Sequence, residues 1–136
     1  MINNFENILV IAPHPDDETL GVGGTIARLT DAGKTVSVLF VSGHLPPIYK
    51  KEDFEKTKVE ALDAMNILGV KKCEFLKIPA TTLSTHPVIK LNGGIKTFFD
   101  EVNPNVVFIP FPDRHVDHRI IFDSSVLTCR LINVRY

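Results

Sequence analysis

The alternation of short strand-like runs with longer helical segments constrains the fold of this chain most. Residues 8–11 (Ile-Leu-Val-Ile) are an apolar run of strand length, as expected of a strand that is buried on both faces. Residues 35–41 are rich in β-branched and aromatic side chains and predict a second strand. Residues 73–78 and 106–110 are expected to be the third and fourth strands.

Helical segments lie between and after these predicted strands. The clearest one repeats apolar side chains at three- and four-residue steps over residues 54–68 and ends before Gly69. Further helices are expected at residues 20–33, 88–102 and 120–131. No linker interrupts the order, so residues 1–136 are predicted to form a single α/β domain with a Rossmann-like, three-layer fold, in which a mostly parallel sheet carries helices on both faces.

Charge, hydropathy and cysteine content exclude several classes of function. Fifteen Lys and Arg residues against sixteen Asp and Glu residues give a formal net charge of −1, so nucleic acid is not an expected partner. No apolar stretch approaches the roughly 18 residues of a membrane span, and residues 1–7 lack the basic start of a leader, so the chain is expected to be cytoplasmic. Cys73 and Cys129 offer neither a disulfide framework nor a CxxC metal site.

Two polar clusters follow predicted strands. Residues 14–18 read His-Pro-Asp-Asp-Glu directly after the first strand, and residues 113–119 read Asp-Arg-His-Val-Asp-His-Arg after the fourth. Ligands of parallel sheets bind beyond the carboxyl ends of the strands. If the first and fourth strands are neighbours, the two clusters face each other across one crevice.

Each cluster has a plain structural interpretation. Asp16, Asp17 and Glu18 suit the capping of a helix N-terminus, and the second cluster suits a solvated turn before a helix. Capping does not explain His14, which stands between two prolines. Imidazole and carboxylate are also ligands of zinc and similar divalent ions, and two His plus one Asp would leave a coordination position for water. No cysteine is near either cluster, which disfavours a structural zinc site.

Together the two motifs resemble the PIG-L/LmbE-like family of zinc-dependent deacetylases. The resemblance lies in Ala-Pro-His-Pro-Asp-Asp-Glu-Thr-Leu-Gly over residues 12–21 and in His-Val-Asp-His-Arg over residues 115–119, and it extends over nearly the whole chain. It implies hydrolysis of the N-acetyl group of an N-acetylglucosamine-type amino sugar or its conjugate. The cofactor implied is Zn²⁺, with another divalent metal as the alternative, and a homo-oligomer stays open.

The resemblance also implies a role for each matching residue. His14, Asp17 and His118 would bind the metal, and Asp16 would be the general base. A protonated His115 would stabilise the oxyanion of the tetrahedral intermediate. Asp117 would orient and charge the imidazole of His115. Whether Asp16 or His115 protonates the departing amine stays open.

Three departures from the family pattern matter for function. Thr57 stands where relatives commonly place an arginine, and His44 stands where they often place a glutamate. Relatives usually run to about two hundred residues or more and continue beyond the second motif, so the chain is expected to lack the usual C-terminal extension. The alternative function is therefore a shortened member that binds metal or sugar without efficient turnover.

A nucleotide-binding domain is the last alternative. The glycines at positions 21, 23 and 24 follow a strand, but they lack the order and spacing of a dinucleotide fingerprint. The neighbouring carboxylates would repel a pyrophosphate.

Overall fold

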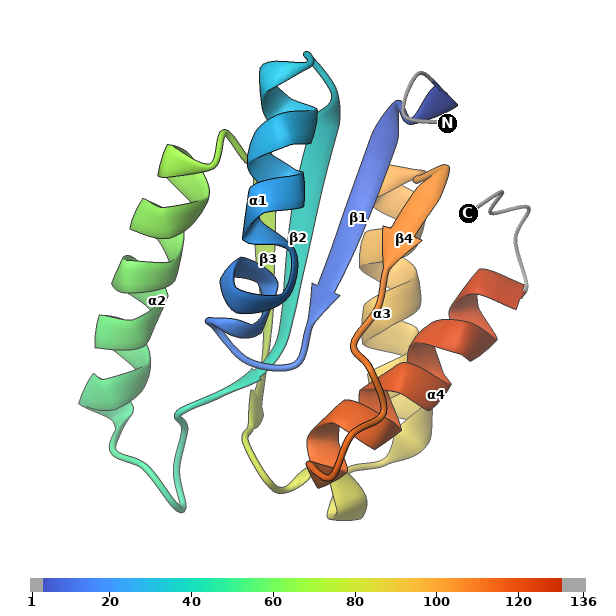
Figure 1. Cartoon of the computed structure of the whole chain (residues 1–136). Helices are drawn as coiled ribbons and strands as arrows, with labels where there is room; N and C mark the ends of the chain where they lie inside the picture. Colours follow the sequence, from blue (N-terminus) through green and yellow to red (C-terminus); the bar gives the residue numbers. More distant parts are fainter. Residues whose placement is uncertain (1–3, 131–136) are drawn as a thin grey trace.

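The computed structural model describes residues 4–130 and confirms the α/β fold class. Within these residues one parallel sheet has the strand order β3-β2-β1-β4 (Figure 1). Its strands are β1 (Asn7–Ala12), β2 (Thr35–Gly43), β3 (Lys72–Pro79) and β4 (Val106–Phe108). Each was expected from the sequence. β4 ends two residues before Pro110, which has no N–H to donate to a ladder.

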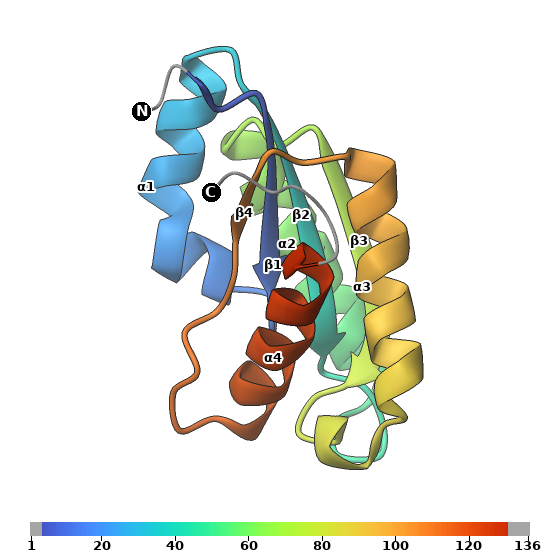
Figure 2. The ribbon, with the colours of Figure 1, turned by 90° about the vertical axis from the view of Figure 1, so that its right-hand side faces the viewer.

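Helices cover both faces of the sheet, as predicted (Figures 1 and 2). The helices α1 (Asp17–Asp31) and α2 (Lys51–Ile67) lie on one face, and α3 (Val88–Val102) and α4 (Val116–Arg130) lie on the other. A short 3₁₀ helix, η2 (Leu83–Thr85), precedes α3. Alternate side chains of each strand enter the two cores, so Ile8 and Val10 pack under α1 and α2 while Leu9 and Ile11 face α3 and α4.

Three helices begin earlier than their apolar periodicity indicated. α1 begins at Asp17 and not at Leu20, α2 at Lys51 and not at Phe54, and α4 at Val116 and not at Ile120. In each case the missed first turn is largely polar, so periodicity does not detect it. The predicted end of the last helix at Leu131 lies outside the described residues. The earlier starts of α1 and α4 place Asp17 and Glu18, and Asp117 and His118, within helical first turns.

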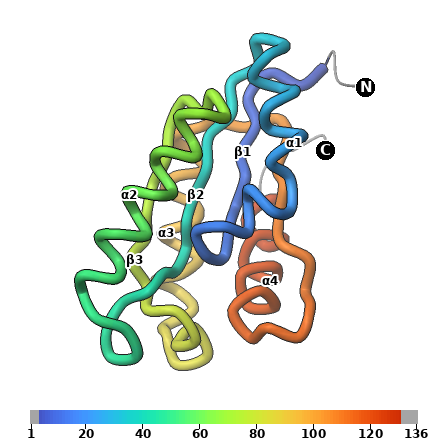
Figure 3. Tube along the Cα trace, turned by 60° about the vertical axis from the view of Figure 1, so that its left-hand side comes forward, coloured from blue at the N-terminus to red at the C-terminus, as the bar shows by residue number. Residues whose placement is uncertain are grey.

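The loop that joins β1 to α1 is fastened to the end of β2. The backbone N–H and the hydroxyl of Ser42 both donate to the carbonyl of Pro13, each at 2.9 Å. Figure 3 shows the chain turning from β1 into α1, and from β4 into α4, at the same end of the sheet. That end carries the carboxyl termini of all the strands.

Candidate metal centre

The two polar clusters meet because β1 and β4 are neighbouring strands. Ile8 pairs with Val106 and Val10 with Phe108, which confirms the adjacency on which the sequence argument depended. The β1–α1 loop supplies His14, and the start of α1 supplies Asp17. The start of α4 supplies His118. Three donors from two distant segments of the chain thus converge.

His14, Asp17 and His118 lie close enough together that they could hold a metal ion. Asp17 Oδ2 lies 3.3 Å from His14 Nδ1 and 3.4 Å from His118 Nε2. One ligand atom of each residue lies within 4.8 Å of the other two. These are the three residues expected as ligands from the sequence, and two imidazoles with one carboxylate suit zinc or a similar divalent ion.

The second ring nitrogen of each of these histidines is held by a carboxylate. His14 Nε2 donates to Asp117 Oδ2 at 3.0 Å, and His118 Nδ1 donates to Asp113 Oδ2 at 3.0 Å. A metal-ligating histidine usually has such a partner, which fixes its tautomer and the orientation of its ring. The free nitrogens are then the ones that face Asp17, so the donor set fits a metal.

A second donor group shares His14 and combines it with His115 and Asp117. In that group Asp117 Oδ2 already accepts the N–H of Thr81 at 2.7 Å and the ring N–H of His14. Asp117 is fully buried. Its carboxylate therefore orients His14, and the group around Asp17 is the better metal site.

Hydrogen bonds to carboxylates dominate the electrostatics of His14. Burial by itself would lower the pKa of His14, but the hydrogen bonds to Asp117 and Asp17 outweigh burial and raise it to about 9. Burial would raise the pKa values of Asp17 and Asp117, and the hydrogen bond to His14 leads the interactions that bring both below the ordinary value. Without metal, the site is therefore an imidazolium between two carboxylates.

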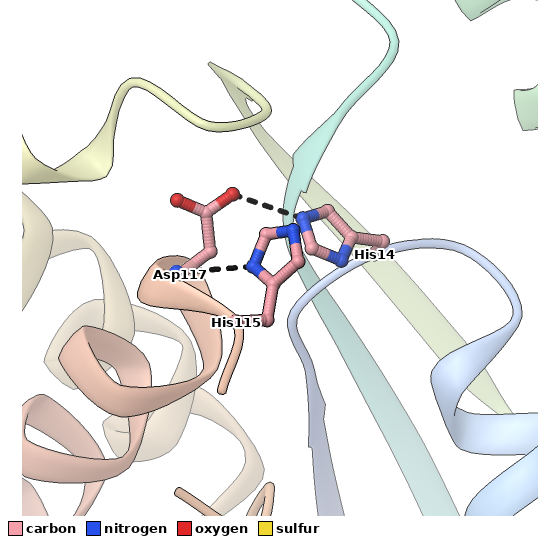
Figure 4. Close-up of side chains that lie close together, drawn as sticks. All are labelled: His14, His115 and Asp117. Atoms are coloured by element: carbon pink, nitrogen blue, oxygen red, sulfur yellow. Dashed lines mark hydrogen bonds and ion pairs between the residues drawn. The ribbon is translucent and has the colours of Figure 1, made fainter. Parts of the chain in front are cut away.

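The contact between Asp117 and His115 differs from the expectation (Figure 4). The carboxylate of Asp117 points to His14, and it is the backbone N–H of Asp117 that donates to His115 Nδ1 at 3.2 Å. With Nδ1 engaged by the main chain, Nε2 is the ring nitrogen of His115 left for other partners. The carboxylate of Asp117, which was expected to orient His115, is therefore directed to His14, and it is the main-chain amide of Asp117 that contacts His115.

Asp16 does not cap α1. Its side chain makes no capping hydrogen bond, and its backbone has a φ of 127°, which is strained for a residue other than glycine. Burial, followed by the charge of Asp17, raises the pKa of the Asp16 carboxyl. An exposed carboxylate with a raised pKa suits proton transfer better than capping.

Glu18 supports the strained backbone of Asp16. Its side chain is only 2% exposed, and Oε2 accepts the backbone N–H of Asp16 at 3.0 Å. Oε1 accepts the hydroxyl of Thr19 at 2.7 Å. Glu18 was expected only to suit the capping of α1. The sequence contains a hint of this contact, because the side chain of an acidic residue two positions after Asp16 can fold back and accept the backbone N–H of Asp16.

Two residues that depart from the family pattern contact each other. His44 Nδ1 lies 3.3 Å from Thr57 Oγ1, and the ring of His44 lies 4.3 Å from that of Tyr49. The positive potential of His44 also lowers the pKa of Asp16, although less than burial raises it. His44 therefore lies close enough to Asp16 to influence its carboxyl group.

A pocket of about 480 Å³ lies beside the candidate metal ligands. Asp17 and His118 contribute its polar wall, and Leu20, Phe108 and Phe111 contribute apolar surface. Leu20 is 82% exposed and Phe111 is 80% exposed. The donors thus lie at the edge of an open and largely apolar hollow.

Comparison with known proteins agrees with the motifs. The sequence matches the model of the family PIG-L, GlcNAc-PI de-N-acetylase, over residues 9–127. It is 37% identical over 134 residues to a diacetylchitobiose deacetylase of Thermococcus kodakarensis, with 86% of this chain and 46% of that protein covered. It is 33% identical over 124 residues to a probable N-acetyl-alpha-D-glucosaminyl L-malate deacetylase 2 of Bacillus cereus, with 82% and 56% covered.

The fold agrees as well. The structure of N,N'-diacetylchitobiose deacetylase from Pyrococcus horikoshii superposes with a TM-score of 0.84 at 26% identity, covering 96% of this chain and 51% of that one. This chain spans about half the length of the curated relatives it matches. Among residues 4–130, no helix is both long and apolar enough to cross a membrane.

Proposed function

This chain belongs to the PIG-L family, and we propose on that premise that it hydrolyses the N-acetyl group of an N-acetylglucosamine-type amino sugar with the help of a bound divalent metal. The observation that carries the proposal is the convergence of His14, Asp17 and His118, with each imidazole held by its own carboxylate. The names of the relatives, which are deacetylases of diacetylchitobiose and of a glucosaminyl malate, support the substrate class.

Zinc is the metal we propose, with another divalent ion as the alternative. When bound, the metal supplies polarisation of an amide carbonyl and lowers the pKa of a water toward about 7. Two neutral imidazoles and one carboxylate would hold it and leave a position open. All of these donors belong to one α/β domain, which we infer is the unit that carries the site.

Asp16 is proposed to accept the proton of the attacking water. It neighbours the ligand Asp17 in sequence, but its side chain is the exposed one, and its pKa is raised while that of Asp17 is lowered. One carboxylate therefore suits metal binding and the other suits proton transfer. The hydrogen bond that the backbone N–H of Asp16 donates to Glu18 Oε2 helps to hold the proposed base in this strained conformation.

His115 is proposed to act through its Nε2–H. Its ring lies 4.9 Å from that of His14 and 4.8 Å from that of His118, between centroids. With Nδ1 engaged by the Asp117 amide, the free Nε2–H is a donor for the oxyanion that develops on the substrate carbonyl. Asp117 serves the reaction by orienting His14.

The test measures bound metal and acetate release on N-acetylglucosamine conjugates, with N,N'-diacetylchitobiose among them. We expect about one metal per chain and substrate-dependent release of acetate. Asp16→Asn should keep the metal and lose turnover by about 100-fold or more. Exposed Asp63 on α2 is the control, since Asp63→Asn should leave both readouts unchanged. If the protein binds metal but releases no acetate, the result would instead support the alternative, a shortened family member that binds metal or sugar without efficient turnover.

A further inference from the structure

One peptide group of the β1–α1 loop, the one that joins Pro13 to His14, is held on both sides. Its carbonyl oxygen, that of Pro13, accepts the backbone N–H and the hydroxyl of Ser42, each at 2.9 Å. Its N–H, that of His14, donates to Asp17 Oδ2 at 3.0 Å. The peptide group therefore connects the end of β2 to the carboxylate that contacts both imidazoles of the candidate metal centre.

The alternation of side chains along β2 places Ser42 where it can reach this loop. Ser42 is on the face of Val38 and Phe40, which pack under α1 and α2. The loop leads to α1, which covers that face (Figure 1). Ser42 is only 3% exposed, and a hydroxyl buried to this degree is costly unless it is hydrogen-bonded. The bond to Pro13 meets that need.

The prolines on either side of His14 make its N–H decisive in this loop. Pro13 and Pro15 carry no N–H, so His14 supplies the only main-chain donor of residues 13–15. That donor goes to Asp17, while two donors on the carbonyl oxygen fix the plane of the same peptide group. They also polarise the amide, which strengthens the hydrogen bond that its N–H donates. A change at the Pro13 carbonyl is thus transmitted to Asp17 through one peptide group.

We propose that Ser42 is a positioning residue of the metal centre, which holds the carboxylate of Asp17 in place through the peptide group between Pro13 and His14. The inference rests on the proposed function for the metal, while the hydrogen bonds are contacts within this chain. A carboxylate that is already held loses less conformational freedom when it becomes a ligand, so the metal binds more tightly. Ser42 takes no part in binding the sugar or in proton transfer.

Ser42→Ala removes the hydroxyl and keeps the backbone N–H, so one of the two bonds to Pro13 stays. We expect the Kd for Zn²⁺, measured by competition with a chromogenic chelator, to rise about 10-fold, at the low end of the loss when the support of a metal ligand is removed. At limiting zinc, acetate release should fall by a similar factor, and excess zinc should restore it to within about 2-fold. A loss of turnover that excess zinc does not restore would overturn the proposal.

Ser125→Ala is the matched control. Ser125 on α4 is fully buried, and its hydroxyl also donates to a main-chain carbonyl, that of Ile121, at 2.6 Å. Both variants should lower the midpoint of urea unfolding, but Ser125→Ala should leave the zinc Kd unchanged, because its bond stays within α4. An unchanged zinc Kd for Ser42→Ala, or an equal rise in both variants, would refute the positioning role.

Amide hydrogen exchange separates this proposal from the proposed function. Exchange of the His14 N–H is followed by NMR in metal-free protein, so the measurement needs neither zinc binding nor acetate release. We expect Ser42→Ala to speed this exchange about 10-fold and Ser125→Ala to leave it unchanged. If the natural chain releases no acetate, the proposed hydrolysis fails, and Ser42 is still judged by the zinc Kd and the exchange rate. An unchanged exchange rate in Ser42→Ala would contradict the proposal.

Discussion

Asp117 joins three parts of the site through one residue. Its carboxylate accepts from His14 and from the Thr81 amide, and its own amide donates to His115. Because these contacts span four separate positions in the chain, a change at Asp117 should disturb the metal site more than a change at a single ligand partner on the surface.

Asp117→Asn should weaken metal binding by about 10- to 100-fold. The asparagine removes the negative charge that orients His14. Its NH₂ group would take the position of the buried Oδ1 atom, where no hydrogen-bond partner is present among residues 4–130. Asp113→Asn is the matched control, because Asp113 holds His118 but is 47% exposed, so solvent compensates its loss. The measurement is a competition titration with a chromogenic chelator. Equal metal affinity for Asp117→Asn and the natural chain would contradict the orienting role.

The raised pKa of His14 should make metal uptake depend on pH. In the metal-free protein His14 is protonated below about pH 9, so a metal must displace that proton. Apparent affinity is therefore expected to rise as pH increases from 7 toward 9 and to level off above it. Isothermal titration in buffers of different ionisation enthalpy counts the protons released. Uptake at pH 7 with no proton release would rule out the imidazolium.

At the scale of elements, two adjacent glycines in α3 differ in how much space surrounds them. A side chain on Gly93 would meet nothing within 4 Å, whereas one on Gly94 would lie 3.0 Å from Leu76 of β3. By helix propensity alone, both glycines would weaken the helix to the same extent. The position of the sheet beneath α3 decides which of them can be replaced.

Gly93→Ala should raise the free energy of unfolding by about 0.5–1 kcal/mol, since alanine loses less backbone entropy in a helix. Gly94→Ala gains the same propensity but must displace Leu76, so its net effect should be clearly smaller or destabilising. Urea denaturation of both variants gives the comparison. Equal stabilisation by the two would mean that α3 does not pack on β3 as closely as described.

At the scale of the whole molecule, the metal site links the beginning and the end of the described fold. His14 precedes α1 and His118 lies on α4, so bound metal should oppose the separation of these segments. A ligand that binds only the folded state stabilises it by mass action. Removal of metal with a chelator should therefore lower Tm, and re-addition should restore it.

The metal-free protein should also lose stability at alkaline pH. The pKa of His14 is higher when folded than its ordinary 6.5, so its contribution is fully present below about pH 6.5 and is lost as pH rises through about 9. We expect the free energy of unfolding to fall by about 3 kcal/mol over this range. His14→Gln, which has no titrating group, should show a smaller decline. An equal decline in both proteins would assign the effect to other groups.

Much of this protein followed from local sequence. Apolar runs such as residues 8–11 identify strands because a buried strand needs no polar face, and residues 54–68 identify a helix through their period. The proposed metal ligands His14, Asp17 and His118 came from the resemblance of two motifs to a known family, and those motifs are easy to find because imidazoles and carboxylates directly follow two strands. Polar first turns were missed at Asp17 and Val116, since they carry no apolar period.

Only the tertiary structure decided which partner each donor has. Asp117 contacts His14, 103 residues away, and the amide of Thr81, 36 residues away. These contacts depend on β4 lying beside β1 and on the loop after β3 crossing the same end of the sheet. Composition and spacing record which side chains follow a strand. The direction in which each points is set by the packing of distant elements, which no local pattern contains.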